Sequence, residues 1–297
     1  MKLVYIAGLS RIGSTVIERV LDTSPSVFAL GEFSSLWTLD FHTLSCSCGS
    51  PVRDCSFWQP ILAEAKVDEQ WRERMLLLER RVARHQLIAK QHLNLKELVQ
   101  NSEVREYLDR INVILSVVSD RSGCKVLIDS SKYPQRAWIL ATLPGTLIVH
   151  LQRDNRDWLA SVRSPKYDAG RGEMQIKYPF LKLIDGWLRC EVSMALLARR
   201  FKTYTLSYEE FASNPKKCLE TSPLNAELGL HLAGIDWRGP SSVAPSSSYH
   251  TVAGNPDRYQ RTQIDIQRKS TLDKLQRRER AYCVFWGNIL NGLRYAL

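Results

Sequence analysis

The 297-residue sequence contains no apolar run long enough to cross a bilayer. Its apolar opening segment, residues 2–7, is followed closely by Ser10 and Arg11, and it lacks the cleavage region of a signal peptide. Internal repeats are also absent. The sequence therefore predicts a cytoplasmic protein without a membrane span.

Acidic residues are the scarcer charged class, because 31 Asp and Glu stand against 41 Lys and Arg, which gives a formal net charge of +10. Such an excess attracts anions such as nucleotides, nucleic acid, anionic lipid or acidic glycans. The basic residues are scattered apart from Arg277, Arg278 and Arg280, a cluster typical of a solvated helix face. They are not interleaved with aromatics in the manner of single-strand binding surfaces, so no nucleic-acid partner is expected.

Paired C-x-x-C motifs are missing from the seven cysteines. Cys46, Cys48 and Cys55 lie close together, and His42 is the nearest candidate for a fourth metal ligand. Three interpretations stay open for this cluster: a metal site, a redox-sensitive or disulfide pair, and reduced thiols. Because cytosolic proteins keep their cysteines reduced, buried thiols are favoured and no bound metal is expected.

Strand and helix patterns alternate along the chain. Strands are predicted at residues 2–7, 27–30, 125–128, 146–151 and 203–206, with helical periodicity between them. This alternation predicts an α/β fold of one domain, residues 1–297, whose central parallel sheet is covered by helices on both faces. Ligands of such sheets bind beyond the carboxyl ends of the strands.

Several other segments have a distinct pattern. Residues 69–120 are mostly helical, residues 41–58 are typical of a loop, and residues 241–249 are rich in Pro and Ser, which predicts a mobile segment. A helix is expected over residues 272–297. Trp158, Trp187 and His150 are interpreted as core residues.

Residues 8–15 have the outline of a phosphate-binding turn between the first strand and the first helix. The nucleotide-triphosphatase version requires Lys after the second Gly, and Ser14 occupies that place. Backbone N–H groups at the helix N-terminus still bind anions without a metal. Arg11 adds a permanent charge, and Ser14 and Thr15 add hydroxyl donors, although a purely structural turn is the alternative.

Three further segments follow in order: Gln152-Arg153-Asp154-Asn155-Arg156, then Ser161 eight residues after Arg153, and then residues 250–258. Weaker matches are Gly31-Glu32, residues 46–49, residues 129–132 and residues 208–210. Together with Arg11-Ile12-Gly13-Ser14-Thr15, the set resembles the sulfotransferases that use 3′-phosphoadenosine 5′-phosphosulfate (PAPS), especially their bacterial and tyrosylprotein-type branch. Ile12 and Ser14 depart from the usual Ser and Thr of that family.

The resemblance implies a P-loop-like sheet, a helical insertion at about residues 57–120 that shapes the acceptor site, and a loop at about residues 241–262 that covers the nucleotide. It also implies roles for individual residues. The nucleotide would be bound by Arg11, Gly13, Ser14, Thr15, Arg153, Ser161, Gly254, Asn255 and Arg258. Within that set, Arg153, Ser161 and Arg258 would bind the 3′-phosphate.

The catalytic residues implied by the resemblance are Arg11 and Lys132, which would stabilise charge, and Glu32, which would act as general base with His42 in reserve. Structural alternatives stay open for each of these: a surface lysine for Lys132, an ion pair with Arg11 for Glu32, and a pair with Asp154 for Arg153.

The predicted reaction is transfer of the sulfuryl group from PAPS to a hydroxyl acceptor, which could be a small molecule, glycan, lipid or peptide, by in-line displacement. A sulfuryl group carries one negative charge, so less charge must be neutralised than in phosphoryl transfer, and no metal is required. Two alternatives remain: a small-molecule kinase that has lost its usual lysine, and a non-catalytic nucleotide- or glycan-binding module.

Overall fold

The computed structural model describes residues 1–40, 42–83, 95–164, 167–168, 173–174, 178–229, 232–246, 249–260, 262–267 and 275–296. Parts of the predicted helical insertion (84–94), late loop (247–248 and 261) and tail helix (272–274 and 297) lie outside the described residues.

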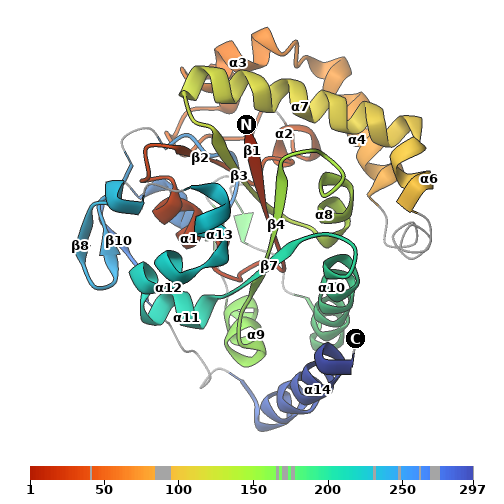
Figure 1. Cartoon of the computed structure of the whole chain (residues 1–297), viewed down its shortest axis with the longest axis vertical. Coiled ribbons are helices and arrows are strands. Elements are labelled where there is room, and N and C mark those ends of the chain that lie inside the picture. Colours follow the sequence, from red (N-terminus) through yellow and green to blue (C-terminus); the bar gives the residue numbers. More distant parts are fainter. Residues whose placement is uncertain are drawn as a thin grey trace.

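A five-stranded parallel sheet lies at the centre of the molecule, in the order β2-β3-β1-β4-β7 (Figure 1). Its strands are β1 (Lys2–Ala7), β2 (Val27–Gly31), β3 (Val126–Lys132), β4 (Thr146–Gln152) and β7 (Thr203–Ser207). The chain places β2 and β3 on one side of β1, and β4 and β7 on the other. The strand order therefore reverses at β1 and β4, which is where ligands bind in open α/β sheets.

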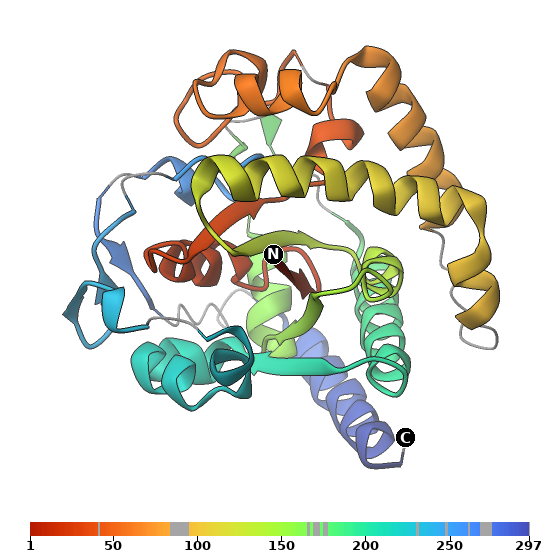
Figure 2. The same cartoon turned by 45° about the horizontal axis from the view of Figure 1, so that its top comes forward.

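Alternate side chains of β1 enter two separate hydrophobic cores. Val4 and Ile6 pack with α1 (Ser14–Leu21), α11 (Tyr208–Ser213), α12 (Pro215–Thr221) and α13 (Pro223–Leu228). Leu3 and Tyr5 pack with α3 (Trp58–Glu64), α4 (Glu69–Val82), α7 (Ser102–Ser122), α8 (Pro134–Leu140) and α10 (Phe180–Ala198). Figure 2 shows α7 and the α11–α13 helices on opposite sides of the sheet. The predicted α/β fold, with helices on both faces, is confirmed.

The remaining helices are α2 (Ser35–Thr38), α6 (Leu95–Gln100), α9 (Asn155–Arg163) and α14 (Arg277–Ala296), with 3₁₀ turns η1 (Val52–Asp54), η2 (Leu232–Gly234) and η3 (Pro256–Tyr259). The described residues also form two small antiparallel sheets. One joins β5 (Tyr167–Asp168) to β6 (Glu173–Met174), and the other joins β8 (Trp237–Gly239), β9 (Ser242–Val243) and β10 (Ile264–Asp265). None of the described helices combines the length and the apolarity that a bilayer crossing requires.

Two predicted segments differ from the structure. The strand expected at 125–128 continues to Lys132, because Asp129 pairs with Tyr5 of β1 and, after a shift in register, Lys132 pairs with Ala7. Asp129 is buried there and its Oδ1 accepts a 2.8 Å hydrogen bond from the Ser131 N–H. The segment expected to be mobile, 241–249, contains strand β9, which is held between β8 and β10.

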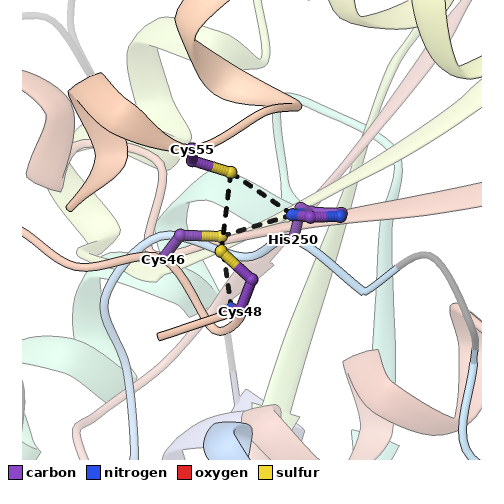
Figure 3. A group of neighbouring side chains, drawn as sticks. All are labelled: Cys46, Cys48, Cys55 and His250. Atoms are coloured by element: carbon purple, nitrogen blue, oxygen red, sulfur yellow. Dashed lines mark hydrogen bonds between the residues drawn. The ribbon is translucent and has the colours of Figure 1, made fainter. Parts of the chain in front are cut away.

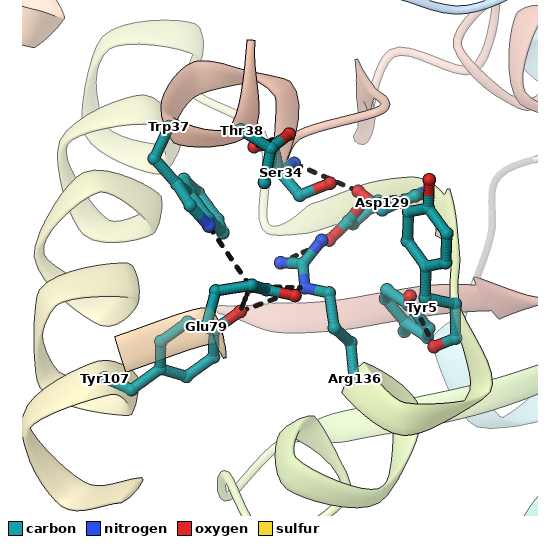
Figure 4. Close-up of polar contacts among 10 residues, drawn as sticks. Tyr5, Ser34, Trp37, Thr38, Glu79, Tyr107, Asp129 and Arg136 are labelled. Atoms are coloured by element: carbon teal, nitrogen blue, oxygen red, sulfur yellow. Dashed lines mark hydrogen bonds and ion pairs between the residues drawn. The ribbon is translucent and has the colours of Figure 1, made fainter. Parts of the chain in front are cut away.

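A buried arginine joins helices α2, α4 and α7 to the sheet (Figure 4). Arg136 of α8 is 0% exposed, and its guanidinium lies 3.6 Å from Glu79 of α4 and 3.7 Å from Asp129 of β3. Its Nε donates to the Tyr107 hydroxyl of α7 at 3.0 Å, and the guanidinium lies 4.9 Å from the ring centre of Trp37 of α2. One cation therefore contacts side chains from the sheet and from three surrounding helices.

Replacing this cation should destabilise the protein strongly. Arg136→Met leaves Glu79 and Asp129 without their central counter-ion, and breaking a buried ion pair in this way costs about 3–5 kcal/mol. Urea denaturation measures the loss. Arg189→Met is the matched control, because Arg189 pairs with Asp185 on an exposed face of α10 and should change the midpoint little. Similar losses in both variants would contradict the role of Arg136.

Candidate functional site

The turn between β1 and α1 depends on a glycine immediately before the helix. Gly13 has a φ of 101°, and a Cβ at this position would lie 2.2 Å from the Tyr208 ring, so only glycine fits. No side chain among the described residues caps α1. Its first N–H groups are therefore oriented as an anion site, reinforced by the positive end of the helix dipole.

Arg11 and Arg153 lie at the ends of the neighbouring strands β1 and β4. The Arg153 Nη1 donates to the Arg11 carbonyl oxygen at 2.9 Å, and the Arg11 Nη2 donates to the Ser161 carbonyl oxygen at 3.3 Å. Trp158 fixes the same arrangement, since its Nε1 donates to the Ser10 carbonyl oxygen at 3.0 Å. The structure thus brings together three residues that the sequence assigned to nucleotide binding. Burial, with a smaller contribution from Arg153, lowers the pKa of Arg11, although Asp257 opposes the shift.

Several buried donors around this turn have no hydrogen-bond partner within the described part of the chain. They are Arg11 Nη1, Ser14 Oγ, Arg153 Nε, and Nε and Nη1 of Arg258. Buried polar atoms are nearly always paired in folded proteins. Arginine cannot lose its charge or accept a hydrogen bond, so the group that satisfies these donors must be an acceptor and is best an anion.

Glu32 and Lys132 form an ion pair beside the turn. Glu32 follows β2, Lys132 ends β3, and the Lys132 Nζ donates to Glu32 Oε1. The Lys132 side chain is only 12% exposed, so it is not a surface lysine, and Glu32 pairs with it rather than with Arg11. Burial lowers the pKa of Lys132, but the charge and hydrogen bond of Glu32 outweigh it and the pKa is raised.

Residues 249–254 lie along the end of β2. The Val252 N–H donates to the Leu30 carbonyl oxygen at 2.9 Å, and the Glu32 N–H donates to the Val252 carbonyl oxygen at 2.9 Å. Gly254 follows with a φ of 109°. A Cβ there would lie 3.9 Å from the Thr15 hydroxyl and 4.0 Å from Glu32 Oε1. Gly254 therefore lies between the turn at residues 8–15, called the phosphate turn below, and the Glu32 carboxylate.

Asn255 and Arg258 have structural contacts of their own. The Asn255 side chain caps η3 by accepting from the Asp257 N–H at 3.3 Å. Arg258 is 2% exposed, and its Nη2 donates to the Tyr259 hydroxyl at 2.5 Å. A Cβ on Gly254 would lie 4.0 Å from the Arg258 Cδ, which places this arginine next to the same glycine.

The two histidines named from the sequence are placed differently. His42, the reserve base, is exposed and its Nδ1 lies 2.6 Å from Arg53 Nη1. His150 is buried as expected, at 6% exposure, and with Gln152 and Glu191 it lines a pocket of about 370 Å³ between the β4–β7 edge of the sheet and α10. Arg11, Arg153 and Arg258 are not among the described residues that line this pocket.

Sequence reasoning missed Glu18, a carboxyl on the inner face of α1. Desolvation raises its pKa to about 7, although a Ser130 hydrogen bond and Lys132 act against the shift. The Tyr249 hydroxyl donates to its Oε1 at 3.4 Å. The sequence signal was slight, because Glu18 and its neighbour Arg19 lie together between the apolar residues Ile17 and Val20.

A model of the sulfotransferase family matches residues 4–221, a span that includes the phosphate turn, Glu32, Lys132, Arg153 and Ser161. The chain belongs to the sulfotransferase family. The segment with Gly254 and Arg258 lies beyond the matched residues.

Among solved structures, the family member is similar to the sulfotransferase STF9 from Mycobacterium avium. The match has 15% sequence identity and a TM-score of 0.42. It covers 78% of this chain and 66% of the mycobacterial chain. No curated protein sequence matches this sulfotransferase family member.

The buried acid gives a pH-dependent prediction. The pKa of Glu18 is about 7 in the native state against 4.5 ordinarily, so between these values the native state retains a proton that the unfolded state releases. The unfolding free energy therefore falls as pH rises through this window. Glu18→Gln keeps the hydrogen bond from Tyr249 without the charge, and should stabilise the protein at about pH 8 by on the order of 3 kcal/mol. The gain should fade toward about pH 5.

Urea denaturation of the two proteins across this pH range gives the difference directly, and other titrating groups cancel in it. A stability difference that stays constant with pH would contradict the raised pKa.

Proposed function

We propose that the chain transfers the sulfuryl group of PAPS to a hydroxyl acceptor by in-line displacement, without a catalytic metal ion. The observation that carries the proposal is the gathering of Arg11, Arg153 and Arg258 near one phosphate-binding turn. Each of them has a buried donor nitrogen without a partner among the described residues. In a member of the sulfotransferase family, the anion that suits these donors is a nucleotide with phosphate at two positions.

The two ends of the nucleotide fit two groups of residues. The α1 N-terminus with Gly13, Ser14 and Thr15 suits the 5′ end, because its backbone N–H groups and hydroxyls are anion donors. Arg153 and Ser161, brought to the turn by β4 and α9, suit the 3′-phosphate. Arg258 is assigned to the same phosphate by the family resemblance.

The chemistry requires one proton acceptor and positive charge. The acceptor oxygen forms a bond to sulfur while the bond from sulfur to the 5′-phosphate oxygen breaks, and 3′-phosphoadenosine 5′-phosphate leaves. Glu32 takes the hydroxyl proton. Its side chain is 29% exposed, so an acceptor can reach the carboxylate, and it lies beside Gly254 and the phosphate turn, where the sulfuryl group would be held. Lys132 holds that carboxylate in place, and with Arg11 it stabilises the charge on the leaving phosphate.

The proposal that sulfuryl transfer needs no metal ion is based on the side chains at the phosphate turn. The residues that gather at the turn include permanent cations and hydroxyls, and the sulfuryl group carries only one negative charge. Arg11 and Lys132 therefore supply the charge stabilisation that Mg²⁺ supplies in kinases. Ser14 occupies the position of the lysine that a P-loop kinase would need.

Selectivity for the 3′-phosphate tests the nucleotide assignment. Isothermal titration calorimetry should show 3′-phosphoadenosine 5′-phosphate binding roughly 10- to 100-fold more tightly than AMP, since charged hydrogen bonds contribute about 1.5–3 kcal/mol. Arg153→Ala should remove most of this preference. Arg156→Ala, which loses only a partly exposed pair with Asp154, should retain it.

Equal affinities for the two nucleotides in the wild-type protein would overturn the assignment. Tight ATP binding that requires Mg²⁺ would favour a kinase instead.

The role of Glu32 is tested by turnover. Glu32→Gln should lower kcat by roughly 10²- to 10⁴-fold, the contribution of a positioned general base, while nucleotide affinity changes only a few-fold. The assay follows labelled sulfate from PAPS onto the best hydroxyl acceptor found by screening. Glu210→Gln, an exposed substitution on α11, is the matched control. An unchanged kcat in Glu32→Gln would rule out its function as the base.

A further inference from the structure

Three thiols and an imidazole meet close to the end of β2 (Figure 3). Their ligand atoms, from Cys46, Cys48, Cys55 and His250, all lie within 4.8 Å of one another. His250 Nδ1 is 3.3 Å from Cys55 Sγ and 3.6 Å from Cys46 Sγ, and Cys48 Sγ is 3.6 Å from Cys55 Sγ. The histidine that joins the cysteines is thus His250, which lies 195 residues from Cys55, and not His42.

These separations match a tetrahedral metal site. With metal–sulfur bonds of about 2.3 Å and metal–nitrogen bonds of about 2.0–2.1 Å, tetrahedral angles place two sulfurs about 3.8 Å apart and a sulfur and nitrogen about 3.6 Å apart. Three of the six separations between ligand atoms, at 3.3–3.6 Å, lie close to these values, and all six are within 4.8 Å. Thiolate-rich sets with one imidazole and tetrahedral geometry favour Zn²⁺.

We propose that Cys46, Cys48, Cys55 and His250 bind one Zn²⁺ ion as a structural site. Four protein ligands complete the tetrahedron and leave no position for water or substrate, which distinguishes structural from catalytic zinc. The ion therefore takes no part in sulfuryl transfer. The assignment depends on this cluster alone and not on the identity of the nucleotide.

The surroundings hold the ligands in this arrangement. The His250 ring stacks on Phe57 with ring centres 5.2 Å apart, and the Trp58 Nε1 donates to the His250 carbonyl oxygen at 2.7 Å. The Cys48 N–H donates to Cys46 Sγ at 3.5 Å, a contact that stabilises a thiolate. Such supporting contacts orient metal ligands and raise metal affinity.

The site has a consequence for the proposed active site. It joins the 46–55 loop to His250, and Val252, two residues later, accepts the hydrogen bond of the Glu32 N–H and donates to Leu30. Zinc at this point would anchor the backbone that holds Glu32 and carries Gly254. This consequence, unlike the metal assignment, rests on the proposed function.

The test is the metal content of the 297-residue chain, purified without a metal-binding tag or added metal. Elemental mass spectrometry should find about one zinc ion per chain. X-ray absorption spectroscopy at the zinc edge should find three sulfur neighbours at about 2.3 Å and one nitrogen neighbour at about 2.0–2.1 Å. Cys48→Ser and His250→Ala should lose most of the zinc. Cys218→Ser, a cysteine outside the cluster on α12, should retain it.

A second measurement separates a structural ion from an adventitious one. A strong zinc chelator should lower the melting temperature of the wild-type protein and of Cys218→Ser, but leave Cys48→Ser unchanged.

Negligible zinc together with free thiols, or a Cys48–Cys55 disulfide found by peptide mass spectrometry, would overturn the proposal. Iron in place of zinc, or equal zinc loss in Cys218→Ser, would do the same. Nucleotide calorimetry is independent of these outcomes, so the two proposals can fail separately.

Discussion

The hydrogen bond from Arg153 to the Arg11 carbonyl oxygen joins the ends of two neighbouring parallel strands, and the rest of the candidate site is arranged around it. It can form because β1 and β4 are adjacent in the sheet, although their sequences are about 140 residues apart. The contact holds one cation against the backbone of the turn at residues 8–15, while one donor nitrogen of each arginine has no partner among the residues that the structure describes. Burial and the charge of Arg153 both lower the pKa of Arg11, and an anion beside the two cations would relieve their repulsion.

The other side of the turn is organised by backbone pairing. Val252 extends the hydrogen bonding of β2 and fixes the backbone of Glu32, and the ion pair with Lys132 fixes its side chain. In the proposed reaction, a base held at both ends would lose little freedom when the acceptor arrives, which is how positioning contributes to rate. The proposed zinc ion would anchor the same segment through His250, two residues before Val252.

Much of this arrangement was predictable from local pattern. The strands at 2–7 and 146–151 are apolar runs that are followed within a few residues by Arg11 and Arg153. Because the carboxyl ends of parallel strands share one edge, these arginines were expected to meet. The extension of β3 was not predictable, because Asp129, Ser130 and Ser131 have the composition of a turn and become strand only through pairing with β1. His250 could not be assigned to the cysteines, since a ligand 195 residues from Cys55 has no local spacing signal. The partner of Glu32 is likewise set by tertiary structure.

The central claim is that one nucleotide with phosphate at two positions spans the phosphate turn and the β4–α9 junction. A crystal structure of the protein with 3′-phosphoadenosine 5′-phosphate tests it most directly. The account predicts the 5′-phosphate against the backbone of Gly13, Ser14 and Thr15, and the 3′-phosphate in contact with Arg153 and Ser161. Nucleotide bound instead in the pocket beside His150 and Glu191, or with its 3′-phosphate in solvent, would contradict it.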